Sequence, residues 1–188
     1  MILVSCRIGD FADNPDSMGA ILIGYRGCGK STIGKRLADN VWAKFVDTDV
    51  LVVQAAGKMI KDIFEQNGEE YFRQLETEAL RQALSQADHI VAVGGGAVMK
   101  EENRAMIKAS GFKCIYLRCE PEALLARIQN DNQSGITRPP LTQLGGGIEE
   151  VKHLVELREP MYRLIMTGEL DVTNLTPEEA ATYITRLL

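Results

Sequence analysis

The residues from Gly24 to Thr32 carry the clearest chemical signal in the chain. They read Gly-Tyr-Arg-Gly-Cys-Gly-Lys-Ser-Thr and match the phosphate-binding pattern Gly-x-x-x-x-Gly-Lys-[Ser/Thr] at every fixed position. The glycines let the backbone curl so that successive N–H groups point at phosphate oxygens. Lys30 can reach the β- and γ-phosphates, and the Ser31 hydroxyl suits a magnesium ligand. The segment therefore predicts binding of a nucleoside triphosphate with Mg²⁺, through Gly27, Cys28, Gly29, Lys30, Ser31 and Thr32.

Cys28 has two interpretations. A thiol beside Lys30 and a helix N-terminus tends to have a lowered pKa, which would suit a redox switch. The simpler interpretation is that the loop needs a small side chain at this position.

Two carboxylates follow the apolar residues of Phe45-Val46-Asp47-Thr48-Asp49. At the end of a parallel strand they would face the crevice where α/β sheets bind ligands. Asp47 could support Mg²⁺, and Asp49 could accept a hydrogen bond or a proton from a substrate hydroxyl. The alternative is that Thr48 or Asp49 only caps the next helix.

Several further residues are ambiguous when each is taken alone. Arg73 and Glu76 are three apart on one helical face and could be a surface ion pair. Gly94-Gly95-Gly96 permits close approach to a ligand, or is simply a tight turn. Arg138 and Arg158 could be ordinary solvated arginines.

The elements that must position these residues alternate between strand and helix. We expect strands at 20–23, 44–47, 90–93, 113–117 and 170–172. We expect helices at 31–40, 101–109, 121–129, 148–166 and 177–188, and a helical stretch over 50–86 broken near Gly57 and Gly68. This alternation predicts an α/β fold with a parallel sheet covered by helices on both faces.

The bulk composition of the 188 residues is that of an ordinary soluble globular protein, with 45% hydrophobic and 25% charged residues. A net charge of −5 argues against non-specific binding of nucleic acid. No apolar run approaches the roughly 20 residues that span a bilayer. Four cysteines without a CxxC pair favour reduced thiols and a cytoplasmic location over a zinc site.

Two segments fall outside the regular pattern. Residues 1–18 are expected to be a disordered N-terminal extension, and 19–188 a single domain. Residues 130–147 are polar, with two prolines and four glycines, and are longer than most connections, so they are expected to be either a functional lid or a disordered segment.

The motifs occur together and in order, and over residues 19–188 the chain resembles the shikimate kinase family. The resemblance rests on the phosphate-binding loop, Asp47-Thr48-Asp49, Ile63-Phe64 with Gly68-Glu69, Phe72-Arg73-x-x-Glu76, Gly94-Gly95-Gly96-Ala97, Thr137-Arg138-Pro139 and Arg158-x-Pro160-x-Tyr162. It implies the P-loop kinase fold, with a five-stranded parallel sheet, a lid loop and a helical substrate-binding region. It also implies transfer of the γ-phosphoryl of ATP to the 3-hydroxyl of shikimate by a monomeric enzyme.

The resemblance also assigns roles to single residues. It implies that Asp49 holds the shikimate hydroxyls, that Arg73 and Arg158 hold its carboxylate, and that Gly95 and Gly96 lie against it. It implies that the lid residue Arg138 reaches the transferring phosphates and that Arg127 stacks on adenine, near a loop at 174–177. Ser31 and Asp47 match the magnesium positions.

Two other functions remain open from the residues alone. One is a kinase of the same fold acting on a related polyol acid. The other is a catalytically silent module that senses shikimate or nucleotide; such a module would be expected to lose Lys30, Asp49 or Arg138, all of which this chain keeps.

Overall fold

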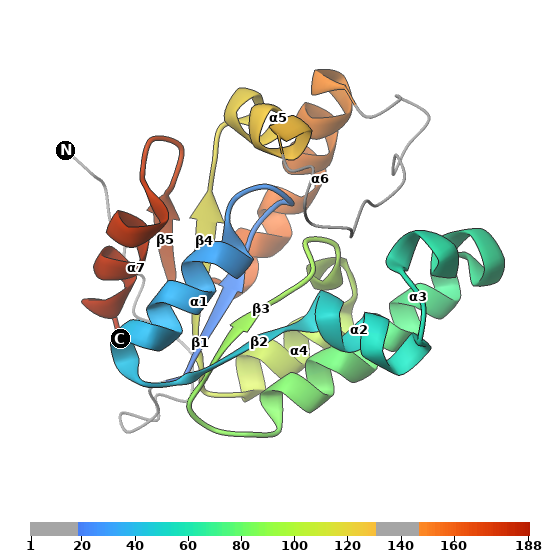
Figure 1. Ribbon diagram of the computed structural model, residues 1–188, viewed down its shortest axis with the longest axis horizontal. Helices are drawn as coiled ribbons and strands as arrows, with labels where there is room; N and C mark the ends of the chain where they lie inside the picture. Colours follow the sequence, from blue (N-terminus) through green and yellow to red (C-terminus); the bar gives the residue numbers. More distant parts are fainter. Residues whose placement is uncertain (1–18, 131–146) are drawn as a thin grey trace.

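The computed structural model describes residues 19–130 and 147–188. All five expected strands form there: β1 (Ala20–Ile23), β2 (Lys44–Asp47), β3 (His89–Ala92), β4 (Lys113–Arg118) and β5 (Gly168–Asp171). They make one sheet in the order β2-β3-β1-β4-β5, and every neighbouring pair is parallel (Figure 1). β1 and β3 are buried at every position, as strands covered on both faces must be.

The helices follow the expected order with small shifts at their ends. They are α1 (Lys30–Val41), α2 (Thr48–Ala56), α3 (Ile60–Leu84), α4 (Glu101–Ala109), α5 (Pro121–Asn130), α6 (Ile148–Ile165) and α7 (Pro177–Thr185). The expected breaks are present: Gly57 ends α2 in the left-handed conformation, and Gly68 interrupts α3 with φ 82° and ψ 174°. The final helix ends at Thr185 rather than at the expected 188. A short 3₁₀ turn, η1 (Ala97–Met99), was not expected.

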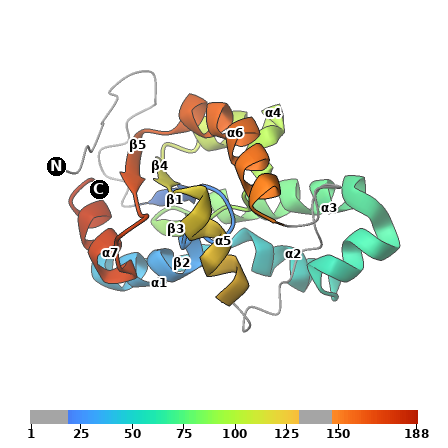
Figure 2. The same ribbon diagram turned by 90° about the horizontal axis from the view of Figure 1, so that it is seen from above.

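The helices form a layer on each side of the sheet (Figure 2). α1 and α7 pack on one face, where Leu37 and Ile184 join the core. α3, α4 and α6 cover the other face through Leu80, Ile107 and Ile165. The sheet is therefore the middle layer of three, and in such sheets ligands bind in the crevice at the carboxyl ends of the strands.

α2 and the first half of α3 form a separate helical unit beyond the β2 edge of the sheet (Figure 1). This unit has its own small core, in which Val52, Ile60, Ile63 and Phe72 are completely buried.

The expected N-terminal extension (1–18) and nearly all of the expected lid, including Arg138, lie outside the described residues. Within the described ranges, no helix is both long and apolar enough to cross a membrane.

Candidate active site

The loop between β1 and α1 adopts a conformation that only glycine permits at its key positions. Gly24, Gly27 and Gly29 have φ of 145°, 82° and 96°. A Cβ on Gly24 would lie 2.7 Å from the backbone oxygen of Leu117, so the loop could not pack against β4 with any other residue there. The glycines thus set the curl that a phosphate-binding loop requires.

Lys30, the first residue of α1, folds back over this loop. Its ammonium donates to the carbonyl oxygens of Gly24 and Tyr25, each at 2.9 Å. It also lies 3.7 Å from the sulfur of Cys28, which is completely buried in the core. Burial of the Cys28 thiol favours the packing interpretation of this position over the redox one.

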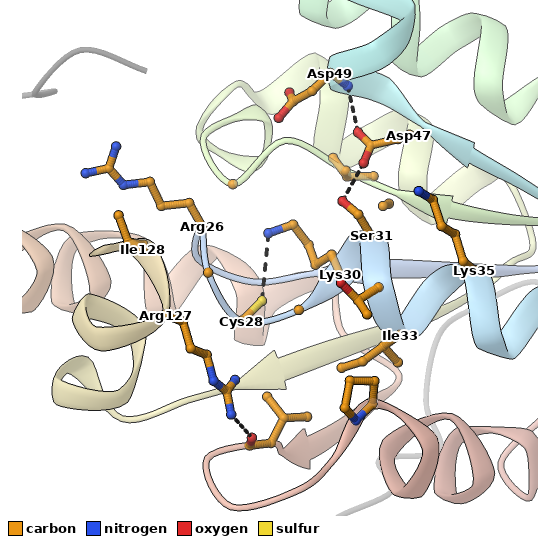
Figure 3. Close-up of a pocket in the computed structure, with 18 of the residues that line it drawn as sticks. Arg26, Cys28, Lys30, Ser31, Ile33, Lys35, Asp47, Asp49, Arg127 and Ile128 are labelled. Carbon is orange, nitrogen blue, oxygen red and sulfur yellow. Dashed lines mark hydrogen bonds between the residues drawn. The ribbon is translucent and has the colours of Figure 1, made fainter. Parts of the chain in front are cut away.

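Ser31 and the two carboxylates meet at the end of β2 (Figure 3). The Ser31 hydroxyl donates to Asp47 Oδ2 at 2.5 Å, and Asp47 Oδ1 accepts from the backbone N–H of Asp49 at 3.0 Å. Asp47 is therefore the N-cap of α2, and the sequence-based alternative that Thr48 or Asp49 caps this helix is wrong.

The surroundings of Asp47 disfavour its charged form. Burial raises the pKa of its carboxyl above the ordinary value, and the negative charge of Asp49 raises it further, although the hydrogen bond from Ser31 opposes the shift. A carboxylate held close to another carboxylate in a partly dry site favours a cation.

Arg73 lies beside the glycine turn that follows β3. A Cβ on Gly96 would be only 2.7 Å from Arg73 Nη1, so the guanidinium packs directly against the bare backbone of the turn. Arg73 pairs with Glu76 at 2.7 Å and with Glu69 at 3.0 Å. Glu76 is only 1% exposed, so this is not the surface ion pair considered as the alternative.

These carboxylates also set the charge state of Arg73. Burial alone would lower the pKa of the guanidinium, but Glu76 and Glu69 together raise it above its ordinary value. Arg73 therefore carries a fixed positive charge at the edge of the turn.

Arg158, on α6, is buried with 6% exposure, so it is not an ordinary solvated arginine. Its guanidinium lies over the ring of Tyr25, 5.5 Å from the ring centroid. Tyr25 belongs to the phosphate-binding loop, so Arg158 connects α6 to this loop.

Arg127 lies on α5, across the pocket from the carboxylates. Its guanidinium donates to the carbonyl oxygens of Val172 at 2.8 Å and Thr173 at 3.0 Å, and to the sulfur of Cys119 at 3.5 Å. These bonds tie α5 to the segment between β5 and α7, which contains the expected adenine loop.

One pocket of about 850 Å³ joins most of these groups. Its walls include the phosphate-binding loop, both carboxylates, Gly95, and Arg127 with Leu175 and Pro177 (Figure 3). Arg73 and Arg158 are not among its lining residues. They border it indirectly, Arg73 through Gly96 and Arg158 through Tyr25.

The structure adds contacts at the site that the sequence pattern does not predict. Arg26 of the loop lines the pocket, and its guanidinium lies 3.7 Å from the carboxylate of Glu150, which is completely buried at the start of α6. Thr48 and Tyr162 both bond to the glycine turn. Thr48 and Tyr162 stand within motifs that were recognised, but their partners are distant in sequence, so no local pattern could have revealed these contacts.

The family model described as shikimate kinase matches residues 26–188. A shikimate kinase of Streptococcus gordonii is 40% identical over 167 residues, which cover 89% of this chain and 98% of that protein. One from Rhodopirellula baltica is 37% identical over 163 residues, covering 87% and 86%.

Among solved structures, a shikimate kinase from Acinetobacter baumannii in complex with shikimate superposes with a TM-score of 0.82 at 29% identity, covering 90% of this chain and 91% of that one. Its fold is the five-stranded parallel sheet described above. The family model covers far more than half of the chain, and the relatives match along nearly their whole length. The chain belongs to the shikimate kinase family of ATP-dependent phosphotransferases.

Proposed function

We propose that this protein transfers the γ-phosphoryl group of ATP to the 3-hydroxyl of shikimate, giving shikimate 3-phosphate and ADP. The observation that carries the proposal is the shared pocket, in which the phosphate-binding loop faces Asp49 and Gly95. Donor and acceptor groups thus open into one space, as direct transfer between two bound substrates requires.

On the donor side, the loop amides and Lys30 bind the β- and γ-phosphates. The Lys30 ammonium has three donors, two of which already bond to the carbonyls of Gly24 and Tyr25. The loop thus holds the charge near the phosphate site. Arg127 and the segment containing Leu175 form the far wall, where adenine binds.

Ser31 and Asp47 fit a magnesium ion. Both present oxygen atoms, which Mg²⁺ prefers. Burial and the charge of Asp49 raise the pKa of Asp47, and a bound cation would offset this destabilisation of the charged carboxylate. Among the described residues no three His, Cys, Asp or Glu side chains gather around one point. The ion would therefore take its remaining ligands from nucleotide phosphates and water, as is usual for Mg²⁺ in kinases, where it neutralises charge on the phosphates.

On the acceptor side, Asp49 binds and orients the shikimate hydroxyl that attacks. Arg73 and Arg158 bind the carboxylate, because a guanidinium can meet a carboxylate with two parallel hydrogen bonds. Gly95 and Gly96 let the ring approach the backbone. Phosphoryl transfer needs mainly positioning and charge stabilisation, so Asp49 need not be a strong base.

Three further proposals concern the whole protein. We infer that Arg138 of the lid approaches the transferring phosphates, as the family resemblance implies. We infer a monomer, as the family resemblance implies. A cytoplasmic location is supported by three buried free cysteines among the described residues, Cys28, Cys114 and Cys119, which suit a reducing compartment.

Replacing Asp49 with asparagine tests the acceptor role. Asp49→Asn should remove most shikimate-dependent turnover, about 100-fold or more, which is within the usual contribution of a positioned acid–base group. The affinity for ATP, measured by calorimetry, should stay within about twofold of wild type, because Asp49 serves the acceptor. A variant that keeps its rate but loses ATP affinity would show that the role is wrongly assigned.

A further inference from the structure

The glycine turn at residues 94–96 is held by two buried hydroxyl groups from opposite sides. The backbone N–H of Gly94 donates to Thr48 Oγ1 at 3.0 Å. The hydroxyl of Tyr162 donates to the carbonyl oxygen of Gly95 at 2.5 Å. Thr48 is 1% exposed and Tyr162 is completely buried, so both bonds are sheltered from water.

Each hydroxyl comes from an element that also carries a proposed acceptor group. Thr48 stands between Asp47 and Asp49 at the start of α2. Tyr162 lies one helical turn after Arg158 on α6, so their side chains share a face of the helix. The positive charge of Arg158 is near enough to oppose the burial that raises the pKa of the Tyr162 hydroxyl.

The glycine turn packs closely against two other parts of the site. Gly95 packs so closely on the phosphate-binding loop that a Cβ there would lie 3.0 Å from the Gly24 carbonyl oxygen. Gly96 is in contact with the guanidinium of Arg73. A small rotation of the turn would therefore move Arg73 and change the backbone presented to the acceptor.

We propose that Thr48 and Tyr162 are positioning residues for the acceptor: together they fix the Gly94–Gly96 turn between Asp49, Arg73 and Arg158. Neither needs to touch the substrate. The inference rests on the proposed acceptor role of the turn, and it names the contacts that give this turn its geometry.

The test uses two variants that remove one hydroxyl each while keeping the shape of the side chain. Thr48→Val leaves the Gly94 N–H without its acceptor, and Tyr162→Phe leaves the Gly95 carbonyl without its donor. Losing a buried bond of this kind should raise the KM for shikimate roughly 3- to 10-fold in each variant. The KM for ATP should stay within about twofold of wild type, because the phosphate-binding loop is unchanged.

The chain offers a matched control for each variant. Thr167 Oγ1 also accepts a backbone N–H, that of Cys114 at 2.9 Å, but it precedes β5 at the opposite end of the sheet from the site. Tyr116 is a buried tyrosine on β4 whose ring stacks on Tyr162 with centroids 5.0 Å apart. Thr167→Val should lower thermal stability by an amount similar to that of the test variants. Tyr116→Phe removes a hydroxyl from the ring that stacks on Tyr162. Both control variants should leave the KM for shikimate unchanged.

The outcomes separate this inference from the proposed function. Shikimate-dependent turnover by the wild-type protein is measured first, and its absence would refute the proposed function. If the wild type is active and the test variants melt earlier with an unchanged shikimate KM, the hydroxyls only stabilise the fold and the inference is wrong. An equal rise in both KM values would also overturn it. Should one variant fail to fold, the other decides the question.

Discussion

Replacing Gly96 with alanine is the sharpest available perturbation of the acceptor site. Gly96 has φ −97° and ψ −13°, which alanine adopts readily, so the backbone should not be strained. The added Cβ would lie 2.7 Å from Arg73 Nη1, whereas ordinary contact begins at 3.4 Å. The guanidinium must therefore move by at least about 0.7 Å, away from the turn.

This displacement should lower the catalytic efficiency strongly and change the stability of the fold little. The guanidinium of Arg73 is at the far end of a flexible side chain and can shift, although its 2.7 Å hydrogen bond to Glu76 would have to adjust. A misplacement of about 1 Å in a positioning group can cost about 100-fold in rate. We therefore expect kcat/KM for shikimate to fall about 10- to 100-fold, chiefly through KM. The melting temperature should be unchanged or slightly higher, because alanine restricts the unfolded chain more than glycine does.

The assay is steady-state ADP release with shikimate varied at saturating Mg²⁺-ATP, together with thermal unfolding. Gly95→Ala is the contrasting variant, because its Cβ would press at 3.0 Å on the backbone oxygen of Gly24, which cannot rotate away. It should lose stability and impair the donor side as well. If Gly96→Ala keeps kcat/KM for shikimate within twofold of wild type, Arg73 does not act from the position described here.

Two further predictions concern the donor side. Asp47→Asn should raise the melting temperature of the ligand-free protein at neutral pH but weaken Mg²⁺-dependent turnover, because asparagine keeps the helix cap and removes a charge held beside Asp49. Burial and Asp49 raise the pKa of Asp47 in the folded state, so this gain should be absent in acid and grow as the pH rises through that pKa; equal pH–stability profiles for the two proteins would contradict the shift. Arg127→Ala should raise the KM for ATP several-fold and leave the KM for shikimate unchanged, because the bonds of Arg127 to Val172 and Thr173 order the nucleotide end of the pocket. A change in the KM for shikimate alone would show that Arg127 does not serve the nucleotide.

Much of the fold could be predicted from local pattern. The apolar runs at 20–23 and 90–93 are typical of strands buried on both faces, and they occupy neighbouring places in the sheet. Gly57 and Gly68 were expected to break the long helical stretch because glycine tolerates positive φ, and both have it. Helix ends were less predictable, because the last turn of a helix depends on what packs against it.

The site was harder to predict wherever its geometry depends on distant contacts. The spacing of Arg73 and Glu76 places them on one face of a helix, but it cannot tell that Glu76 is buried. The carboxylates after β2 were recognised, yet which residue caps α2 depends on the local turn, and Asp47 does so. The bond from Tyr162 to Gly95 joins residues 67 positions apart, so only the folded chain reveals it.

The proposed kinase activity is tested most directly by ADP release from the purified protein at fixed ATP and Mg²⁺, measured with and without shikimate. We expect slow ATP hydrolysis without shikimate and a large increase when shikimate is added, with shikimate 3-phosphate formed in equal amount to ADP. A well-folded protein that binds ATP but releases no additional ADP with shikimate would contradict it.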